Sequence, residues 1–193
     1  MDNEIFKERE RALEEEYVRK HEAELIEKLR ARAKLGDIAE ALAVMLRVDN
    51  PELLRRIMGV GVTLDTGVAF LLAPMVQVAW AEGRVTDRER ETVLRIAGER
   101  GIEEGSPAHA QLLEWLRVRP SDFLFEAAID AIRVGLAVLP PEERAVRVKR
   151  YLDACGQVAA ASGGLGRLLG LGTGVSTEEE SVLYTIGATL RAR

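Results

Sequence analysis

Apolar residues recur along this chain at helical spacing, and no segment shows the alternation typical of a strand. Residues 2–34 are dense in Glu, Arg and Lys and contain no Gly or Pro, which is typical of a long solvated helix. An apolar stripe recurs there at steps of four: Leu13, Tyr17, His21, Leu25, Leu29 and Ala33. Such steps exceed the ~3.6 residues of a helical turn, so the stripe winds round the helix. The pattern predicts an N-terminal helical arm over residues 1–35.

The narrow stripe leaves two interpretations of this arm open. It packs across its own domain, or it pairs with another helix in self-association or partner capture. In the second case the contact residues are Leu13, Tyr17, Leu25 and Leu29. Acidic residues match basic ones throughout the arm, which argues against a basic, membrane-seeking helix.

Residues 36–59 predict a helical connector. Gly36 suits a left-handed helix end, and Asp37 can cap a short helix that follows. Pro51 then fits the first turn of a second short helix, which ends before Gly59. The remaining residues, 60–193, predict one all-α domain.

A repeat organises this domain. Gln77–Gly83 returns as Gln157–Gly163 at an offset of 80, and Val85–Glu89 aligns with Val175–Glu179 at an offset of 90. The ten extra residues fall in the Gly-rich run 165–174. Each copy predicts an apolar helix, a turn and a capped amphipathic helix. We therefore expect a helical bundle of two related helix–turn–helix units.

The first unit shows these elements most clearly. Leu64 to Glu82 is apolar on almost every side, which predicts a buried central helix, kinked at Pro74. Gly83 allows a turn, and Thr86 with Glu89 three residues later forms a capping-box pattern.

The second unit repeats the cap and adds a loop. Ser176 or Thr177 is expected to cap the last helix, with a glutamate three residues further on. The Gly-rich run lacks the strand and the Gly-Lys-Ser/Thr of a phosphate-binding loop, so we expect a mobile surface loop. Alternatively its leucines, Leu168 and Leu169 among them, dock a partner.

Composition and charge narrow the class further. Of 193 residues, 47% are hydrophobic, 31% charged and only 5% aromatic, as expected of a globular helical protein. A net charge of −5 argues against nucleic acid as the partner. The single cysteine, Cys155, excludes an internal disulfide and fits a reducing cytoplasm. We expect neither a secretory signal nor an integral membrane segment.

The turn after the central helix resembles a known family. Ala79 to Glu89, read Ala-Trp-Ala-Glu-Gly-Arg-Val-Thr-Asp-Arg-Glu, is similar to the turn of the TerB-like, tellurite-resistance-associated helical domains. The resemblance covers roughly residues 60–193 and implies an all-α, cytoplasmic bundle without established catalysis, linked to stress and metal-oxyanion responses. It also implies acidic metal ligands at this turn, which by position are Glu82 and Glu89. The family's usual Asp is Glu at position 82, and Ser162 stands where the second copy would carry an acid.

Glu82, Asp87 and Glu89 supply three carboxylates at this turn, so a divalent cation is one hypothesis. The turn is too short for a calcium loop, and Arg84 and Arg88 would repel a cation. Helix capping accounts for the acids without a metal. We expect no bound cofactor, with a divalent cation as the alternative.

A second charged cluster lies in the helix predicted after Pro141. Arg144, Arg147, Lys149 and Arg150 form the one compact positive group in the sequence. A solvated helix face is the simpler interpretation, and a site for an anionic partner or phosphate is the alternative.

Together these features predict a non-enzymatic interaction module in a bacterial stress or metal-resistance setting. Two distant histidines and one cysteine on an apolar helix provide no grouping for nucleophilic or acid–base catalysis. A protein partner or a second copy of the chain is expected at the arm. The alternative is a divalent-metal sensor that uses the acidic turns.

Overall fold

The computed structural model describes residues 20, 24–25, 39–40, 42–162 and 175–192. The chain divides into two compact units, Met1–Glu40 and Ala41–Arg193. Within the first unit the five described residues are helical. Part of the expected connector, residues 36–59, therefore belongs to the second unit, together with the domain expected over 60–193.

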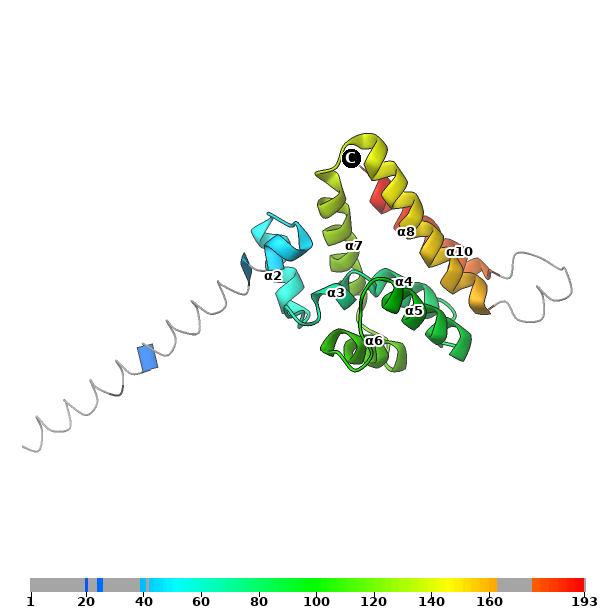
Figure 1. The fold of residues 1–193 in the computed structure, drawn as a ribbon, viewed down its shortest axis with the longest axis horizontal. Helices are drawn as coiled ribbons and strands as arrows, with labels where there is room; N and C mark the ends of the chain where they lie inside the picture. The colour runs from blue at the N-terminus through cyan, green and yellow to red at the C-terminus, as the bar shows by residue number, and fades with distance from the viewer. Residues whose placement is uncertain (1–19, 21–23, 26–38, 41, 163–174, 193) are drawn as a thin grey trace, which may run out of the picture. The chain divides into compact units, whose positions relative to one another are not determined.

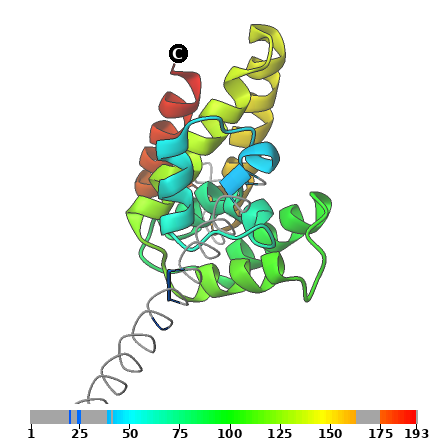
Figure 2. The same ribbon diagram turned by 90° about the vertical axis from the view of Figure 1, so that its left-hand side faces the viewer.

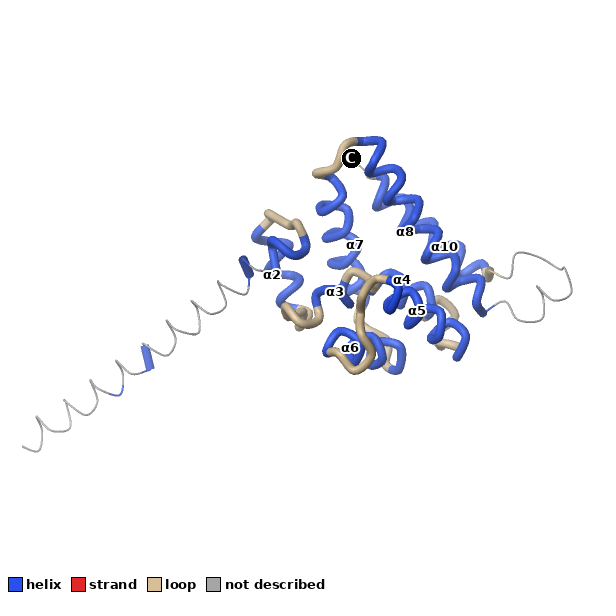
Figure 3. Tube along the Cα trace, viewed as in Figure 1, coloured by secondary structure: helices blue, strands red, loops and turns tan. Residues whose placement is uncertain are grey.

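The second unit is built from helices, and the described residues contain no strand, so the all-α prediction is confirmed (Figure 3). The elements in chain order are α2 (Pro51–Gly59), α3 (Gly67–Phe70), α4 (Ala73–Ala79), α5 (Asp87–Glu99), α6 (Pro107–Arg117), α7 (Asp122–Ala137), α8 (Pro141–Ser162) and α10 (Thr177–Arg191).

Helix α4 lies at the centre of this unit and contacts α5, α6, α7, α8 and α10 (Figure 1). Every residue of α4 except Gln77 is buried, as its apolar sequence predicts. Met75, Val76 and Val78 are fully excluded from water, and burying a side chain of this size contributes about 1.5–3 kcal/mol. The core of the domain is therefore organised round one short helix.

The prediction of one continuous helix from Leu64 to Glu82 is wrong. The segment forms two helices, α3 and α4, joined by turn residues at Leu71 and Leu72. Pro74 stands in the first turn of α4, where its missing N–H is tolerated, but it cannot donate to Phe70 in the preceding turn. The apolar pattern continues across the break because residues of both helices are buried in the core.

Longer helices surround this centre. α8 and α10 run antiparallel and in contact, and both also contact α7 (Figure 2). Arg56 on α2 forms an ion pair with Asp130 on α7 at 2.9 Å, and Arg95 on α5 donates to the side chain of Gln157 on α8 at 2.9 Å. These polar contacts join elements that lie far apart in the sequence.

Both expected capping boxes are present. Thr86 accepts from the backbone N–H of Glu89, whose carboxylate accepts from the Thr86 N–H at 2.6 Å. Ser176 and Glu179 make the same pair of bonds at the start of α10, at 3.2 and 2.7 Å. The second cap is thus Ser176 with Glu179, which decides between the alternatives that the sequence left open. Each box satisfies two N–H groups that have no partner inside the helix.

These caps predict equal losses from two distant substitutions. Thr86→Ala and Ser176→Ala should each lower the free energy of unfolding by about 1 kcal/mol, measured by denaturant titration. Thr92→Ala is the control, because its hydroxyl only bonds a carbonyl within α5. A loss at Thr92 as large as at the caps would contradict this account.

Candidate functional site

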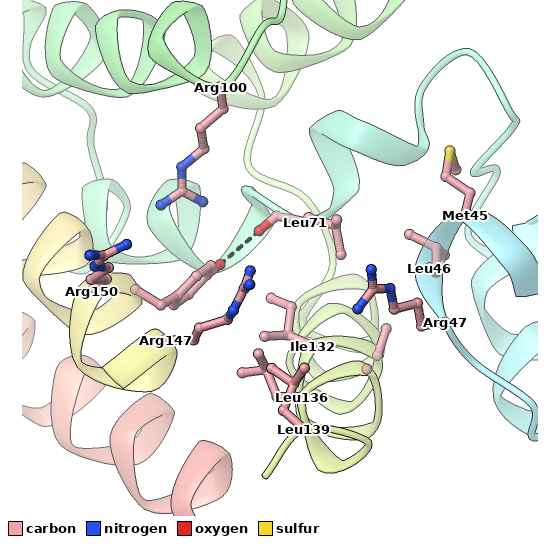
Figure 4. A pocket seen from close by; sticks show the side chains of 13 residues that line it. Met45, Leu46, Arg47, Leu71, Arg100, Ile132, Leu136, Leu139, Arg147 and Arg150 are labelled. Carbon is pink, nitrogen blue, oxygen red and sulfur yellow. Dashed lines mark hydrogen bonds between the residues drawn. The ribbon is translucent and has the colours of Figure 1, made fainter. Parts of the chain in front are cut away.

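An open pocket of about 530 Å³ lies in the second unit, between α7, α8 and the segment that precedes α2 (Figure 4). Its volume falls within the range of small-molecule sites, ~300–1,000 Å³. Four arginines line it, from three parts of the chain: Arg47, Arg100, Arg147 and Arg150. Among the described residues that line it, none is acidic.

Tyr151 and Leu71 connect the pocket to the break between α3 and α4. The Tyr151 hydroxyl donates to the Leu71 carbonyl at 2.8 Å (Figure 4). In a continuous helix that carbonyl would accept from the N–H of Met75, but Met75 donates to Leu72 instead. Because Pro74 lacks an N–H, it does not compete for Leu71 either. The broken helix thus provides the acceptor that binds α8.

Arg47 enters the pocket from a strained backbone position. Its φ is +54°, and it is the only described residue other than glycine with positive φ. It follows the helical residues 42–46, and the N–H groups of Arg47 and Val48 donate back to Val44 and Ala43. This is the helix end at which glycine is the usual residue. An L-residue in this conformation costs about 1–2 kcal/mol.

Gly135 on α7 allows this helix end to approach closely. A Cβ at position 135 would lie 3.0 Å from the carbonyl oxygen of Leu46 and 3.9 Å from the Cβ of Arg47. A larger side chain would therefore separate α7 from one wall of the pocket.

Most of the positive charge in the pocket has no acidic partner among the residues that the structure describes. Arg147 donates to Glu143 through Nε and Nη2, at 3.2 and 2.9 Å. Its remaining N–H groups are available for other acceptors, because a guanidinium carries five. Within the described part of the chain, Arg47, Arg100 and Arg150 form no ion pair.

The arginine side chains approach the pocket from different directions. The Cζ atom of Arg100 lies 5.5 Å from the ring centroid of Tyr151, within cation–π range. The guanidinium groups of Arg47 and Arg147 point toward each other from opposite sides of the pocket (Figure 4). A ligand with anionic oxygens can accept hydrogen bonds from both, and such charge-assisted bonds are among the strong ones.

The buried titratable groups next to the pocket are poorly suited to nucleophilic chemistry. Burial raises the pKa of the Cys155 thiol to about 12, so the reactive thiolate is scarce at neutral pH. Burial also raises the pKa of the Tyr151 hydroxyl well above its ordinary value of 10, although Arg100 acts in the opposite direction.

The carboxylates expected to bind a metal do not converge into a metal site. Glu82 and Asp87 are exposed, whereas Glu89 is 2% exposed and its Oε2 accepts from both the backbone and the hydroxyl of Thr86. No group of three or more His, Cys, Asp or Glu side chains with metal-binding geometry occurs among the described residues. The capping interpretation accounts for Glu89.

Glu89 has a counterpart in the second copy. Glu179 is fully buried, and its other carboxylate oxygen accepts from the Ser162 hydroxyl at 3.0 Å. Burial raises the pKa of Glu89 above 4.5, outweighing the bonds from Thr86, and the nearby charges of Glu179 and Glu82 raise it further. In the repeat, Ser162 stands at the position where the first copy carries the acid Glu82. In the structure its hydroxyl donates a hydrogen bond to the capping residue Glu179.

Most of the expected partner-binding residues lie outside the described residues: Leu13, Tyr17, Leu29, Leu168 and Leu169. Leu25 is described, and its side chain is 55% exposed within a helical segment. The partner-binding role of these residues stays a prediction.

The positive cluster of α8 divides between two sites. Arg147 and Arg150 line the 530 Å³ pocket. Arg144 and Lys149 line a smaller pocket of about 230 Å³ near the end of α10, and Lys149 also pairs with Asp153 at 3.1 Å. The sequence does not indicate Arg47 and Arg100 as pocket residues, because they lie far from α8 in the chain and reach the pocket only when the protein is folded.

The fold and the site define an all-α helical domain with an open, arginine-lined pocket. Comparison with family models, curated proteins and solved structures found no match to this chain. Among the helices that the structure describes, none has the length and apolar content to cross a lipid bilayer.

The bond between Tyr151 and Leu71 predicts a loss of stability on removal of one oxygen atom. Tyr151→Phe should lower the free energy of unfolding by about 1–2 kcal/mol, because the Leu71 carbonyl loses its donor. Tyr184→Phe is the matched control, since Tyr184 is 79% exposed. Equal stability of Tyr151→Phe and the parent protein in denaturant titration would argue against the bond.

The raised pKa of Glu89 predicts a dependence of stability on pH with a definite sign. The folded state binds an extra proton between 4.5 and the folded pKa, so the contribution of Glu89 to stability falls as pH rises through that window. The stability of the parent protein minus that of Glu89→Gln should therefore decrease from about pH 4.5 toward neutral pH. Exposed Glu126→Gln is the control for the substitution, and a difference that grows with pH would reverse our conclusion.

Proposed function

We propose that this chain is a non-enzymatic binding module whose ligand presents a negatively charged group to the arginine-lined pocket. The observation that carries the proposal is the convergence of Arg47, Arg100, Arg147 and Arg150 on a cavity whose described lining contains no acidic residue. Like charges in one cavity repel each other, so the arrangement favours a state in which an anion is bound. A protein partner with an acidic group satisfies the proposal, as does phosphate.

The conformation of Arg47 supports this role. Glycine would relieve the strain at φ +54° but would remove a guanidinium from the pocket. Backbone strain in a well-packed protein is characteristic of positions that serve function. A charged side chain in this conformation, at the wall of a cavity, fits a binding role.

We further propose that the domain consists of two related helix–turn–helix units of the TerB-like kind. The equivalent capping boxes at Thr86–Glu89 and Ser176–Glu179 support the relation, as do the contacts of α4 with α8 and α10. A role in stress or metal-oxyanion resistance, in the cytoplasm, follows from this resemblance alone and stays a prediction. Self-association through residues 1–35 stays a prediction as well.

The divalent-metal sensor remains the alternative function. The observation that favours it is that the charges of Glu179 and Glu82 add to the effect of burial in raising the pKa of Glu89. Glu89 and Glu179 are both engaged as caps, however, and a metal would have to displace these bonds. The arginine-lined pocket therefore has the stronger support.

Anion binding can be tested with inorganic phosphate and variants of the pocket. Phosphate should raise the melting temperature of the parent protein more than chloride at equal ionic strength, because only a ligand of the folded state stabilises it. Arg150→Gln should reduce this increase. Arg47→Gly should also reduce it, while raising the free energy of unfolding without phosphate by about 1 kcal/mol.

Arg88→Gln is the matched control for the loss of one guanidinium. Arg88 is exposed and does not line the pocket. It lies in the first turn of α5, about 18 Å along the helix axis from Arg100, the residue that follows the other end of α5. Arg144→Gln removes a charge from the neighbouring pocket of about 230 Å³ and so shows whether phosphate binds there instead. If phosphate stabilises Arg150→Gln as strongly as the parent protein, or stabilises neither, the proposed site is wrong.

A further inference from the structure

The arginine-lined pocket has a second, apolar side. Ile132 and Leu136 on α7 and Leu139 just beyond its end line the pocket, as do Leu46 and Leu71. Figure 4 shows the side chains of Ile132, Leu136 and Leu139 grouped below the facing guanidinium groups of Arg47 and Arg147. The pocket therefore combines a cationic side with an apolar side.

The apolar side is accessible rather than part of the closed core. Leu71, Leu136 and Leu139 are half-buried, and Ile132 keeps 8% of its surface exposed. A ligand that covers these side chains gains about 25 cal/mol for each Å² of apolar surface that it removes from water. A bare inorganic anion would leave this surface uncovered.

The surroundings also disfavour a nucleotide base. Tyr151 is the one aromatic residue in the described lining, and its ring is already covered by the guanidinium of Arg100. Bases in protein sites commonly stack on open aromatic faces. The remaining apolar surface is aliphatic, which suits a flexible alkyl chain.

We infer that the ligand is an amphiphilic anion, a phosphate monoester or carboxylate on a short alkyl chain. Its head accepts hydrogen bonds from Arg47 and Arg147, and its chain lies along α7. From residue 132 to residue 137, where α7 ends, the helix rises about 7.5 Å, which matches an extended chain of about six or seven carbons. This inference rests on the proposed function, since it names the class of anion that the pocket binds.

A homologous series of alkyl phosphates tests the apolar side directly. Inorganic, butyl, hexyl and octyl phosphate, each kept below its micelle concentration, are titrated into the full chain by calorimetry. Affinity should rise about threefold for each methylene buried, which corresponds to ~0.7 kcal/mol. Octanol, the neutral match for the chain, should bind at least about tenfold more weakly than octyl phosphate, because it makes no charge-assisted bonds.

Two kinds of variant separate the two sides of the pocket. Leu136→Ala should reduce the gain per methylene and leave the affinity for inorganic phosphate unchanged. Arg147→Gln, which removes one of the two donors to the head group, should weaken every phosphate in the series. Leu113→Ala is the control, because Leu113 is 40% exposed on α6 and does not line the pocket. Circular dichroism melting identifies a variant that fails to fold, and Leu139→Ala then replaces Leu136→Ala.

The outcomes distinguish this inference from the proposed function. If all the phosphates bind with equal affinity and Arg147→Gln weakens each of them, the amphiphilic ligand is excluded and the anion site stands. If no phosphate binds, both proposals fail. Binding to vesicles of phosphatidylcholine and phosphatidic acid without binding to octyl phosphate would point to a membrane surface and overturn the small-ligand inference.

Discussion

The hydrogen bond from Tyr151 to the carbonyl of Leu71 joins the centre of the domain to the wall of its pocket. It depends on the break between α3 and α4, where Pro74 prevents an unbroken ladder of backbone bonds. A carbonyl inside a continuous helix already accepts a backbone N–H, whereas Pro74 has no N–H to give Leu71 and Met75 donates to Leu72 instead. Because Tyr151 is held there, its ring supports Arg100, and the adjacent turn of α8 places Arg147 and Arg150 on the pocket.

The pocket then concentrates positive charge at positions that contribute little to stability. Arg47 occupies a conformation that favours glycine, and Arg100 and Arg150 have no ion-pair partner in the described part of the chain. Exposed ion pairs elsewhere, such as Arg95 with Glu99, follow the ordinary spacing of a helix surface. The residue that would make the helix end at Arg47 most stable is therefore not the residue that the pocket needs. Such a trade-off between stability and function is common at binding sites.

The sequence predicts the parts of this structure that depend on local spacing. The capping boxes depend on two residues three positions apart, and the burial of α4 on a continuous apolar run, so both could be inferred. The break at Leu71 could not, because Pro74 is compatible with either a kink or a new first turn. Only part of the pocket could be predicted from the sequence. Arg147 and Arg150 are neighbours on α8, whereas Arg47 and Arg100 reach the pocket from other segments. Expectations for residues 1–35 and 165–174 concern parts that the structure, apart from three residues of the arm, does not describe.

The cap of α10 has a consequence for how the chain can change in length. Ser176 and Glu179 define the first turn of that helix through bonds within four residues, so its start does not depend on how many residues precede it. The entropy of closing a connection between two helices grows only slowly with its length. Length variation between Ser162 and Ser176 should therefore be tolerated, and a foreign peptide grafted there would leave α8 and α10 in register.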